Sequence, residues 1–265
     1  MKKNYFKCSE IRKDIINIIS ASGAAHVASS LSCVEILTAI YENINIKKIK
    51  SNKKDRDKVI LSKGHATASL YATLKQFNLM TNKDLLTYSK ENTYLAGHPN
   101  HLIKHVEHST GALGHGLPVG VGMCLASRSL GFKNKVYIVL GDGELHEGSN
   151  WEAMMFAGHH KLNNLRIFVD NNGQSQIGET DSACSLKSLS KKISAFNFKV
   201  IMVDGNSFFD LDKKIKQNIN STKPTAFICN TIKGKGVSFM EKNNLWHYKT
   251  PKGEELKKSL EEIKI

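Results

Sequence analysis

The stretch VYIVLGDGELHEGSNWEA, residues 136–153, joins an apolar run to a segment with acidic residues at positions 142, 144, 147 and 152. The run VYIVL has the length and β-branched content of a buried strand, and the residues near 148–161 have a helical pattern. A strand followed by a helix is the repeating unit of parallel sheets. We therefore expect Asp142 to lie just beyond the carboxyl end of a buried strand.

The same alternation continues along the chain and predicts the fold class. Further β-branched runs are LRIFVD, FKVIMVD and TAFICN, at residues 165–170, 198–204 and 225–230. Helical patterns cover residues 9–20, 32–43, 65–78, 116–130, 186–195 and 207–220. Apolar strands separated by helices predict an α/β fold, with a parallel sheet flanked by helices on both faces. With only four prolines and no internal repeat or linker, the chain is expected to form a single domain, residues 1–265.

Composition narrows the class of protein. Of the 265 residues, 40% are hydrophobic and 23% are charged, which is ordinary for a soluble globular chain, and no apolar stretch is long enough to span a membrane. Glu10, Arg12 and Asp14 interrupt any apolar segment that could direct export. The five cysteines are scattered and include no CxxC pair, which favours a reducing compartment. We therefore expect a cytoplasmic protein that does not associate with membranes.

The formal net charge of +14 would suit nucleic acid, an acidic partner or phosphorylated substrates. Lysines are spread along the chain, however, with no basic arm and no interleaved aromatic residues. The charge distribution therefore argues against nucleic acid, and a solvated lysine-rich surface is its simplest interpretation.

Two oxygen donors are expected to meet at one edge of the sheet. Asp142 follows the strand 136–140 and Asn172 follows the strand 165–170, and a right-handed crossover would place these two strands side by side. Carboxylate and amide oxygens suit Mg²⁺ or Ca²⁺, and Mg²⁺ is commonly completed by substrate phosphates. Gly141 and Gly143 permit a tight turn, and the helix that follows presents its N-terminus to an anion. The pair predicts a metal-bound diphosphate, although GDG or NNG alone would be an ordinary turn.

The pairing of GDG with a later NN resembles the thiamine-diphosphate motif, and other blocks resemble the amino-terminal, diphosphate-binding region of transketolase. These blocks are SGAAHVASSLS, RDKVILSKGHATASLY, GHPN, STGALGHGLPVGVGMCLA and IKGKGVSFMEKNNLWH. The resemblance covers essentially the whole chain. It implies the thiamine-diphosphate-binding fold, with Asp142, Asn172 and the backbone carbonyl near Gln174 as ligands of Mg²⁺ or Ca²⁺.

The resemblance also implies the other site residues. The expected substrate-contacting, catalytic residues are His26, His98 and His247. The expected cofactor-binding residues are His65, Gly111, Ala112, Leu113, Gly143, Glu144, Asn172 and His247. Ala25 and Ala28 depart from the family by replacing glycines, and each adds a Cβ beside the cofactor.

Two groups of residues admit more than one interpretation. If residues 98–108 were helical, His101 and His105 would share a face and, with His98 and His108, could bind zinc, although Pro99 and the absence of nearby acidic or cysteine partners argue against it. Glu147 and Glu152 match family glutamates that link two active sites, but acidic residues are also common in the first turn of a helix.

The resemblance implies transfer of a two-carbon ketol unit between sugars or sugar phosphates. Transketolases carry a pyrimidine-binding domain and a carboxy-terminal domain after the region matched here. We therefore expect those domains on a separate subunit, in an α2β2 assembly that completes the site. The alternatives are a subunit of another thiamine-diphosphate enzyme, of the deoxyxylulose-phosphate synthase or 2-oxoacid-decarboxylating kind, or a non-catalytic scaffold of the same fold.

Overall fold

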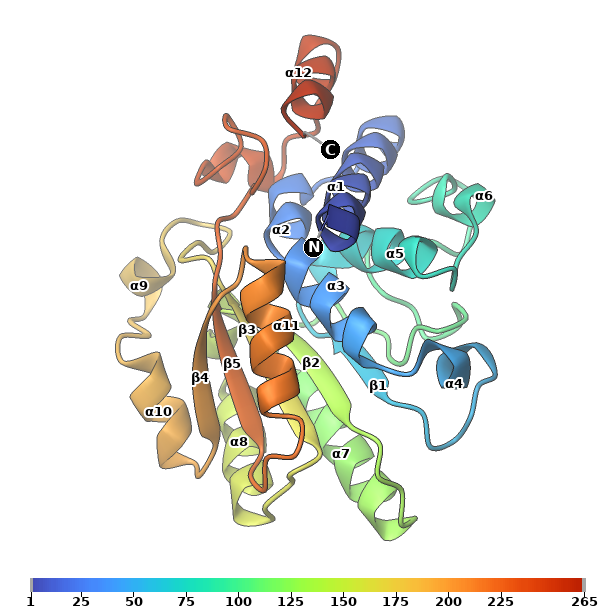
Figure 1. The fold of residues 1–265 in the computed structure, drawn as a ribbon. Helices are drawn as coiled ribbons and strands as arrows, with labels where there is room; N and C mark the ends of the chain where they lie inside the picture. Colours follow the sequence, from blue (N-terminus) through green and yellow to red (C-terminus); the bar gives the residue numbers. More distant parts are fainter. Residues whose placement is uncertain (1, 264–265) are drawn as a thin grey trace.

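A five-stranded parallel sheet forms the centre of the computed structural model, which describes residues 2–263 (Figure 1). The strand order is β1-β2-β3-β5-β4, and every neighbouring pair is parallel. The strands are β1 (Lys58–Leu61), β2 (Val136–Gly141), β3 (Leu165–Asn171), β4 (Lys199–Asp204) and β5 (Thr225–Asn230). The predicted α/β fold with a parallel sheet is confirmed.

Helices cover both faces of this sheet (Figure 1). The α-helices are α1 (Lys2–Ser22), α2 (Val27–Ser32), α3 (Val34–Asn43), α4 (Ile46–Lys50), α5 (Thr67–Gln76), α6 (Asn82–Leu85), α7 (Gly116–Ser129), α8 (Gly148–His159), α9 (Thr180–Ala183), α10 (Leu189–Ala195), α11 (Phe208–Gln217) and α12 (Glu254–Glu262). Short 3₁₀ helices are η1 (Gly64–Ala66), η2 (Gly143–His146) and η3 (Asn244–His247). None of the helices within residues 2–263 is long and apolar enough to cross a membrane.

The alternation of side chains along β2 shows why both faces are covered. Tyr137 and Val139 join a core with α1, α3, α5 and α11, whereas Ile138 and Leu140 join a second core with α7, α8 and α10. Because successive side chains of a strand point to opposite faces, a strand buried on both faces reads as a continuous apolar run. This is the property that made VYIVL recognisable in the sequence.

The sequence pattern missed one strand and misplaced some helix ends. The four-residue strand β1 was not predicted, because KVIL is too short to show a period. The pattern over residues 65–78 predicted one helix, but the structure contains η1 followed by α5. The pattern over residues 32–43 begins at the last residue of α2 and then covers α3, with Cys33 at the junction.

The register of the strands brings their carboxyl ends together. Gly141 at the end of β2 is paired with Asp170 of β3, and Asp170 is paired with Cys229 of β5. The residues that follow β2, β3 and β5 therefore lie at one edge of the sheet, as open parallel sheets require. The loop after β1, which contains η1, lies at the same edge because Leu61 is paired with Val139.

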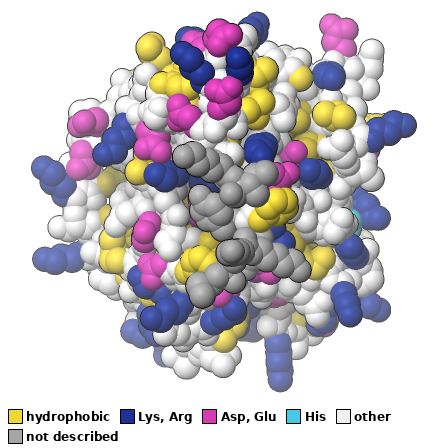
Figure 2. All heavy atoms as spheres, turned by 45° about the horizontal axis from the view of Figure 1, so that its top comes forward, with side chains coloured by type: hydrophobic (Ala, Val, Ile, Leu, Met, Phe, Trp, Pro, Cys, Tyr) yellow, Lys and Arg dark blue, Asp and Glu magenta, His cyan; other side chains and the backbone are white. Residues whose placement is uncertain are grey.

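Surface charge is dispersed on the face that Figure 2 shows. Lysine and arginine side chains are spread around that face, with acidic side chains among them. The high net charge therefore does not form one continuous basic patch there.

Candidate active site

A cavity of about 380 Å³ lies at the carboxyl edge of the sheet. It is lined by most of the residues that the sequence singled out: His26, His65, His98, Gly111, Leu113, Asp142, Gly143, Glu144, Asn172, Gln174 and His247. Ala112 is the one predicted site residue that does not line it. A larger hollow of about 1030 Å³, between α6 and residues 102–105, contains none of the predicted site residues.

Asp142 occupies the N-cap of η2, directly after β2, and is 2% exposed. One carboxylate oxygen accepts a hydrogen bond from the Gly143 N–H at 2.8 Å. The other accepts from the Gly173 N–H at 2.6 Å and from the Thr180 hydroxyl at 3.2 Å. Burial, followed by the negative charge of Asp170, raises the pKa of Asp142 to about 6. A bound divalent cation would favour the ionised form of this carboxylate.

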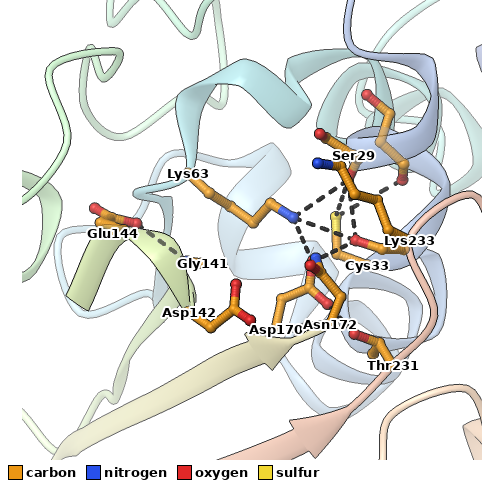
Figure 3. A network of polar contacts seen from close by, with 12 residues as sticks. Ser29, Cys33, Lys63, Gly141, Asp142, Glu144, Asp170, Asn172, Thr231 and Lys233 are labelled. Carbon is orange, nitrogen blue, oxygen red and sulfur yellow. Dashed lines mark hydrogen bonds and ion pairs between the residues drawn. The ribbon is translucent and has the colours of Figure 1, made fainter. Parts of the chain in front are cut away.

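Asn172 directly follows β3 and lies beside Asp170 (Figure 3). Its amide oxygen accepts from the Gln174 N–H at 3.0 Å, and its amide nitrogen donates to Asp170 at 3.5 Å. Both Asp142 and Asn172 line the cavity together with Gln174. The predicted neighbourhood of the two donors is therefore present, and its oxygen-rich chemistry fits Mg²⁺ or Ca²⁺.

Next to Asp142 and Asn172 lies an ion pair that the sequence pattern did not predict (Figure 3). Lys63, which follows β1, contacts Asp170 of β3, and the two side chains are 1% and 0% exposed. Asp170 also accepts hydrogen bonds from the hydroxyls of Ser32 and Thr231. Burial lowers the pKa of Lys63, but the charge and hydrogen bond of Asp170, together with the charges of Cys33 and Asp142, outweigh this effect and raise the pKa above its ordinary value.

Lys233 adds a second cationic group to the cavity wall. Its ammonium donates to the Ser175 carbonyl at 2.9 Å, and the residue is 2% exposed. Burial and the nearby charge of Lys63 lower the pKa of Lys233 to about 8. Lys63 belongs to the sequence block SKGHA and Lys233 to the block IKGKG. Local sequence does not show that these two lysines line the same cavity.

Four histidines from separate blocks meet in the cavity. The His26 ring lies 4.9 Å from the His247 ring, 5.6 Å from His65 and 6.3 Å from His98, measured between centroids. His26 has a left-handed backbone with φ of 70°, a conformation rare outside glycine, and its N–H donates to the His247 carbonyl at 2.9 Å. Histidines that belong to separate sequence motifs therefore form one cluster.

His26, His65 and His247 are held in the neutral form. Burial, followed by the charge of His98, lowers the pKa of His26 to about 4, and burial, followed by the charge of Lys233, lowers that of His247 to about 4. The pKa of His65 is also lowered well below its ordinary value, first by burial and then by Lys63. The charged groups on the cavity wall are therefore Lys63, Lys233, Asp142 and Glu144 rather than these three imidazoles, and the two lysines are the groups that suit an anion such as a diphosphate.

Two buried polar atoms on the cavity wall have no protein partner within the described residues. They are Nδ1 of His247 and Oε1 of Gln174. Buried polar groups are normally hydrogen-bonded, so these atoms are places where a ligand can be accommodated. Together with the oxygen-rich corner and the lysines, they fit a metal-bound diphosphate cofactor.

Glu144 uses its carboxylate on the protein itself. One oxygen accepts from the Ser62 hydroxyl and from the Gly114 N–H at 3.1 Å, and the other accepts from the Gly141 N–H at 3.1 Å. Glu144 lines the cavity and is 2% exposed. Glu147 and Glu152, by contrast, are exposed on the surface.

The helical premise of the alternative zinc site is wrong. Residues 101–105 form turns, His105 has φ of 70°, and Nδ1 of His101 lies 2.7 Å from the hydroxyl of Ser109. Within residues 2–263, no three histidine, cysteine, aspartate or glutamate side chains are grouped to hold a metal ion.

The fold and the site define a thiamine-diphosphate-binding domain, and comparison with known proteins identifies its family. Residues 5–263 match the family described as "Transketolase, thiamine diphosphate binding domain". The chain therefore belongs to the transketolase family.

Two similar relatives are themselves named as subunits of transketolases. The apulose-4-phosphate transketolase subunit of Actinobacillus succinogenes is 40% identical over 97% of this chain and 95% of its own length. The 6-deoxy-6-sulfo-D-fructose transketolase subunit SqwG of Clostridium sp. (strain MSTE9) is 36% identical over 87% of this chain and 85% of its own length.

Longer transketolases match over their corresponding part only. Human transketolase is 34% identical over 91% of this chain, which covers 39% of the human protein. The crystal structure of transketolase from Campylobacter jejuni gives a TM-score of 0.90 at 27% identity, covering 99% of this chain and 43% of that one. The chain thus spans roughly two-fifths of the length of these longer relatives.

Proposed function

We propose that this chain is the diphosphate-binding subunit of a two-subunit transketolase. The complete enzyme transfers a two-carbon ketol unit between sugars or sugar phosphates, using thiamine diphosphate and a divalent metal. The observation that carries the proposal is the meeting of the Asp142 and Asn172 corner with the cluster of four histidines in one cavity. Membership of the family and the subunit names of two relatives support it.

In this proposal the metal ion is held by the side chains of Asp142 and Asn172 and by the backbone carbonyl of Gln174. Their oxygen ligands suit Mg²⁺ or Ca²⁺. The positive charges of Lys63 and Lys233 attract the diphosphate to this end of the cavity.

The histidines act on the sugar. The chemistry supplied by bound thiamine diphosphate is nucleophilic attack on a ketose carbonyl and stabilisation of the charge left after C–C cleavage. His26, His98 and His247 orient the sugar, and a neutral imidazole can donate one hydrogen bond and accept another. The depressed pKa values of His26 and His247 keep that dual capacity at neutral pH.

We further propose that a carboxy-terminal subunit, with pyrimidine-binding and carboxy-terminal domains, completes the site in an α2β2 assembly. Met155 and Phe156 on α8 are 57% and 42% exposed, and Leu130, just after α7, is 64% exposed. Exposed large apolar side chains on α8 and at the end of the neighbouring α7 are typical of a surface that another chain covers. A covering chain would also exclude water from the reacting carbon.

The single-domain organisation of residues 1–265 and a cytoplasmic location remain parts of the proposal. Supporting the location, all five cysteines are free and four of them are buried. Reduced cysteines are usual in the cytoplasm.

The test is to purify the chain alone and together with a candidate carboxy-terminal subunit, and to measure mass and ketol transfer. We expect a complex of two copies of each subunit whose turnover depends on thiamine diphosphate and Mg²⁺. Full turnover by the chain alone would contradict the two-subunit proposal.

The same experiment separates the alternative functions. A tight complex without thiamine-dependent chemistry would favour the scaffold. Release of CO₂ from a 2-oxoacid would favour a decarboxylating enzyme, although the histidine cluster at His26, His65, His98 and His247 favours sugar chemistry.

A further inference from the structure

Glu144 joins three segments that are far apart in the sequence. Its carboxylate accepts three hydrogen bonds: from the Ser62 hydroxyl just after β1, from the Gly114 N–H in the loop before α7, and from the Gly141 N–H at the end of β2. The last of these bonds is drawn in Figure 3. Both carboxylate oxygens are therefore engaged by donors of the protein, in a position that is 2% exposed.

The two backbone bonds reach two separate segments that line the cavity. Gly111 and Leu113 line the cavity just before Gly114, while Asp142 and Gly143 line it just after Gly141. The Glu144 side chain thus connects these two segments of the cavity wall. A rigid bridge matters for a ligand that must contact both walls at once, because loose walls would add an ordering cost to binding.

The Gly114 turn is also contacted on its other side, by Glu147 and Ser149. Gly114 has φ of 83°, and a Cβ there would lie 2.5 Å from the hydroxyl of Ser149 and 2.6 Å from Cβ of Glu147. The carbonyl of Gly114 accepts from the Ser149 hydroxyl at 2.8 Å. The Gly114 carbonyl is thus held by Ser149, while the Gly114 N–H points at Glu144.

We propose that Glu144 is a positioning residue that fixes the spacing of the two cofactor-facing loops, 110–116 and 141–144, rather than a direct ligand of the cofactor. This inference rests on the proposed function for the identity of the cofactor. The bridge itself does not depend on it. A carboxylate is required because each oxygen accepts a backbone N–H, and an amide nitrogen in place of one oxygen would face a donor with a donor.

The first experiment measures amide hydrogen exchange in the full chain without cofactor, comparing wild type with Glu144→Gln. We expect the amides of Gly114, Gly141 or both to exchange about tenfold faster, because a buried N–H loses a charged acceptor. Amides within β3, at residues 167–169, should be unchanged. The matched control is Glu261→Gln, an exposed glutamate of α12, which should leave both loops at the wild-type rate.

Unchanged exchange at both glycines in Glu144→Gln would overturn the proposal, and so would equal acceleration across the whole sheet. If Glu144→Gln does not fold, Glu144→Asp provides the second test, because it keeps the carboxylate but shortens the side chain by one methylene, so the carboxylate cannot reach both N–H groups. It should raise exchange at Gly114, Gly141 or both. No change at either glycine in that variant would also overturn the proposal.

The second experiment uses the complex of this chain with its partner subunit. It compares two probes, thiamine diphosphate and inorganic pyrophosphate, each with Mg²⁺. Under the proposed function the thiamine part of the cofactor would contact the loop 110–116, and pyrophosphate lacks that part. We expect Glu144→Gln to weaken thiamine diphosphate binding about tenfold, and pyrophosphate binding by less than about threefold, as expected for lost preorganisation of two walls. Equal losses for the two probes would contradict the bridging role.

These outcomes are separable from those of the proposed function. If wild-type protein did not bind thiamine diphosphate, the function would be wrong, while the exchange result on the cofactor-free chain would still decide the bridging role of Glu144.

Discussion

Lys63 and Asp170 form an ion pair that is almost completely excluded from solvent, although 107 positions separate them in the chain. Lys63 follows β1 and Asp170 lies in β3, so the pair reaches across the end of β2. Lys63 also donates to the Ser29 carbonyl at 3.2 Å and to the Ser32 hydroxyl at 3.3 Å. The pair therefore ties α2 to the edge of the sheet that carries Asp142.

Breaking this pair from one side should strongly destabilise the fold. Lys63→Met leaves Asp170 buried without its cation, and Asp170→Asn leaves the ammonium unpaired, so each should lower the free energy of unfolding by about 3–5 kcal/mol. The double variant should lose less than the sum of the two. Urea unfolding measures all three values.

The control for these three variants is the exposed pair Lys216 and Asp212 on α11, in which the lysine side chain is 63% exposed. Lys216→Met should cost less than about 1 kcal/mol. Additive losses at Lys63 and Asp170 would show that the two groups are not energetically coupled.

Asp142→Ala should remove metal-dependent cofactor binding. We expect the affinity for thiamine diphosphate in the presence of Mg²⁺ to fall about 100-fold or more, because the variant loses a charged metal ligand. Calorimetric titration of the assembled enzyme measures it. Asp181→Ala is the control, since Asp181 is exposed nearby and its carboxylate accepts from the Leu186 N–H instead. An unchanged affinity in Asp142→Ala would remove the metal-site assignment.

His26→Ala and His98→Ala should affect the sugar more than the cofactor. If these imidazoles orient the donor or transfer a proton, ketol transfer should fall about 100-fold. The affinity for thiamine diphosphate should change by no more than about threefold, because neither side chain belongs to the metal corner. His101→Ala, outside the cavity, should behave as wild type. Normal transfer rates in both variants would assign these histidines a structural role.

Acid should destabilise the protein through its buried histidines. The pKa values of His26 and His247 are about 4 in the folded protein, below the ordinary value of 6.5. Above about pH 7.5 neither state is protonated, and the contribution of these histidines does not change with pH. As the pH falls from 6.5 towards 4, the unfolded chain binds protons that the folded protein does not, so the free energy of unfolding decreases.

His247→Asn should flatten this decrease when unfolding is measured between pH 4.5 and about 7.5, the range around the ordinary histidine pKa. The raised pKa of Asp142 acts in the opposite direction, because the folded state then holds a proton more tightly than the unfolded chain. Comparing wild type with His247→Asn cancels that contribution. The same pH slope in both proteins would show that the imidazole of His247 does not titrate on unfolding.

Local sequence was sufficient for much of the fold and for the outline of the site. The apolar run before Asp142 predicted β2 because a strand buried on both faces needs no polar positions. Asp142 and Asn172 were predicted to meet because β2 and β3 are consecutive strands joined by one crossover. The histidines were identified through their motifs, since no periodicity marks a cavity.

Only the tertiary structure showed which of these groups touch. The four residues of β1 are too few for a recognisable period, and without β1 at the edge of the sheet the Lys63 and Asp170 pair has no geometric basis. The bonds of Glu144 to Gly114 and Gly141 likewise depend on how two loops pack together. Local patterns encode turns, periods and burial, whereas strand order and the pairing of buried charges are decided by the packing of the whole chain. A buried charge is costly unless it is paired. Lys63 and Asp170 can therefore be buried only because the packed chain brings them together.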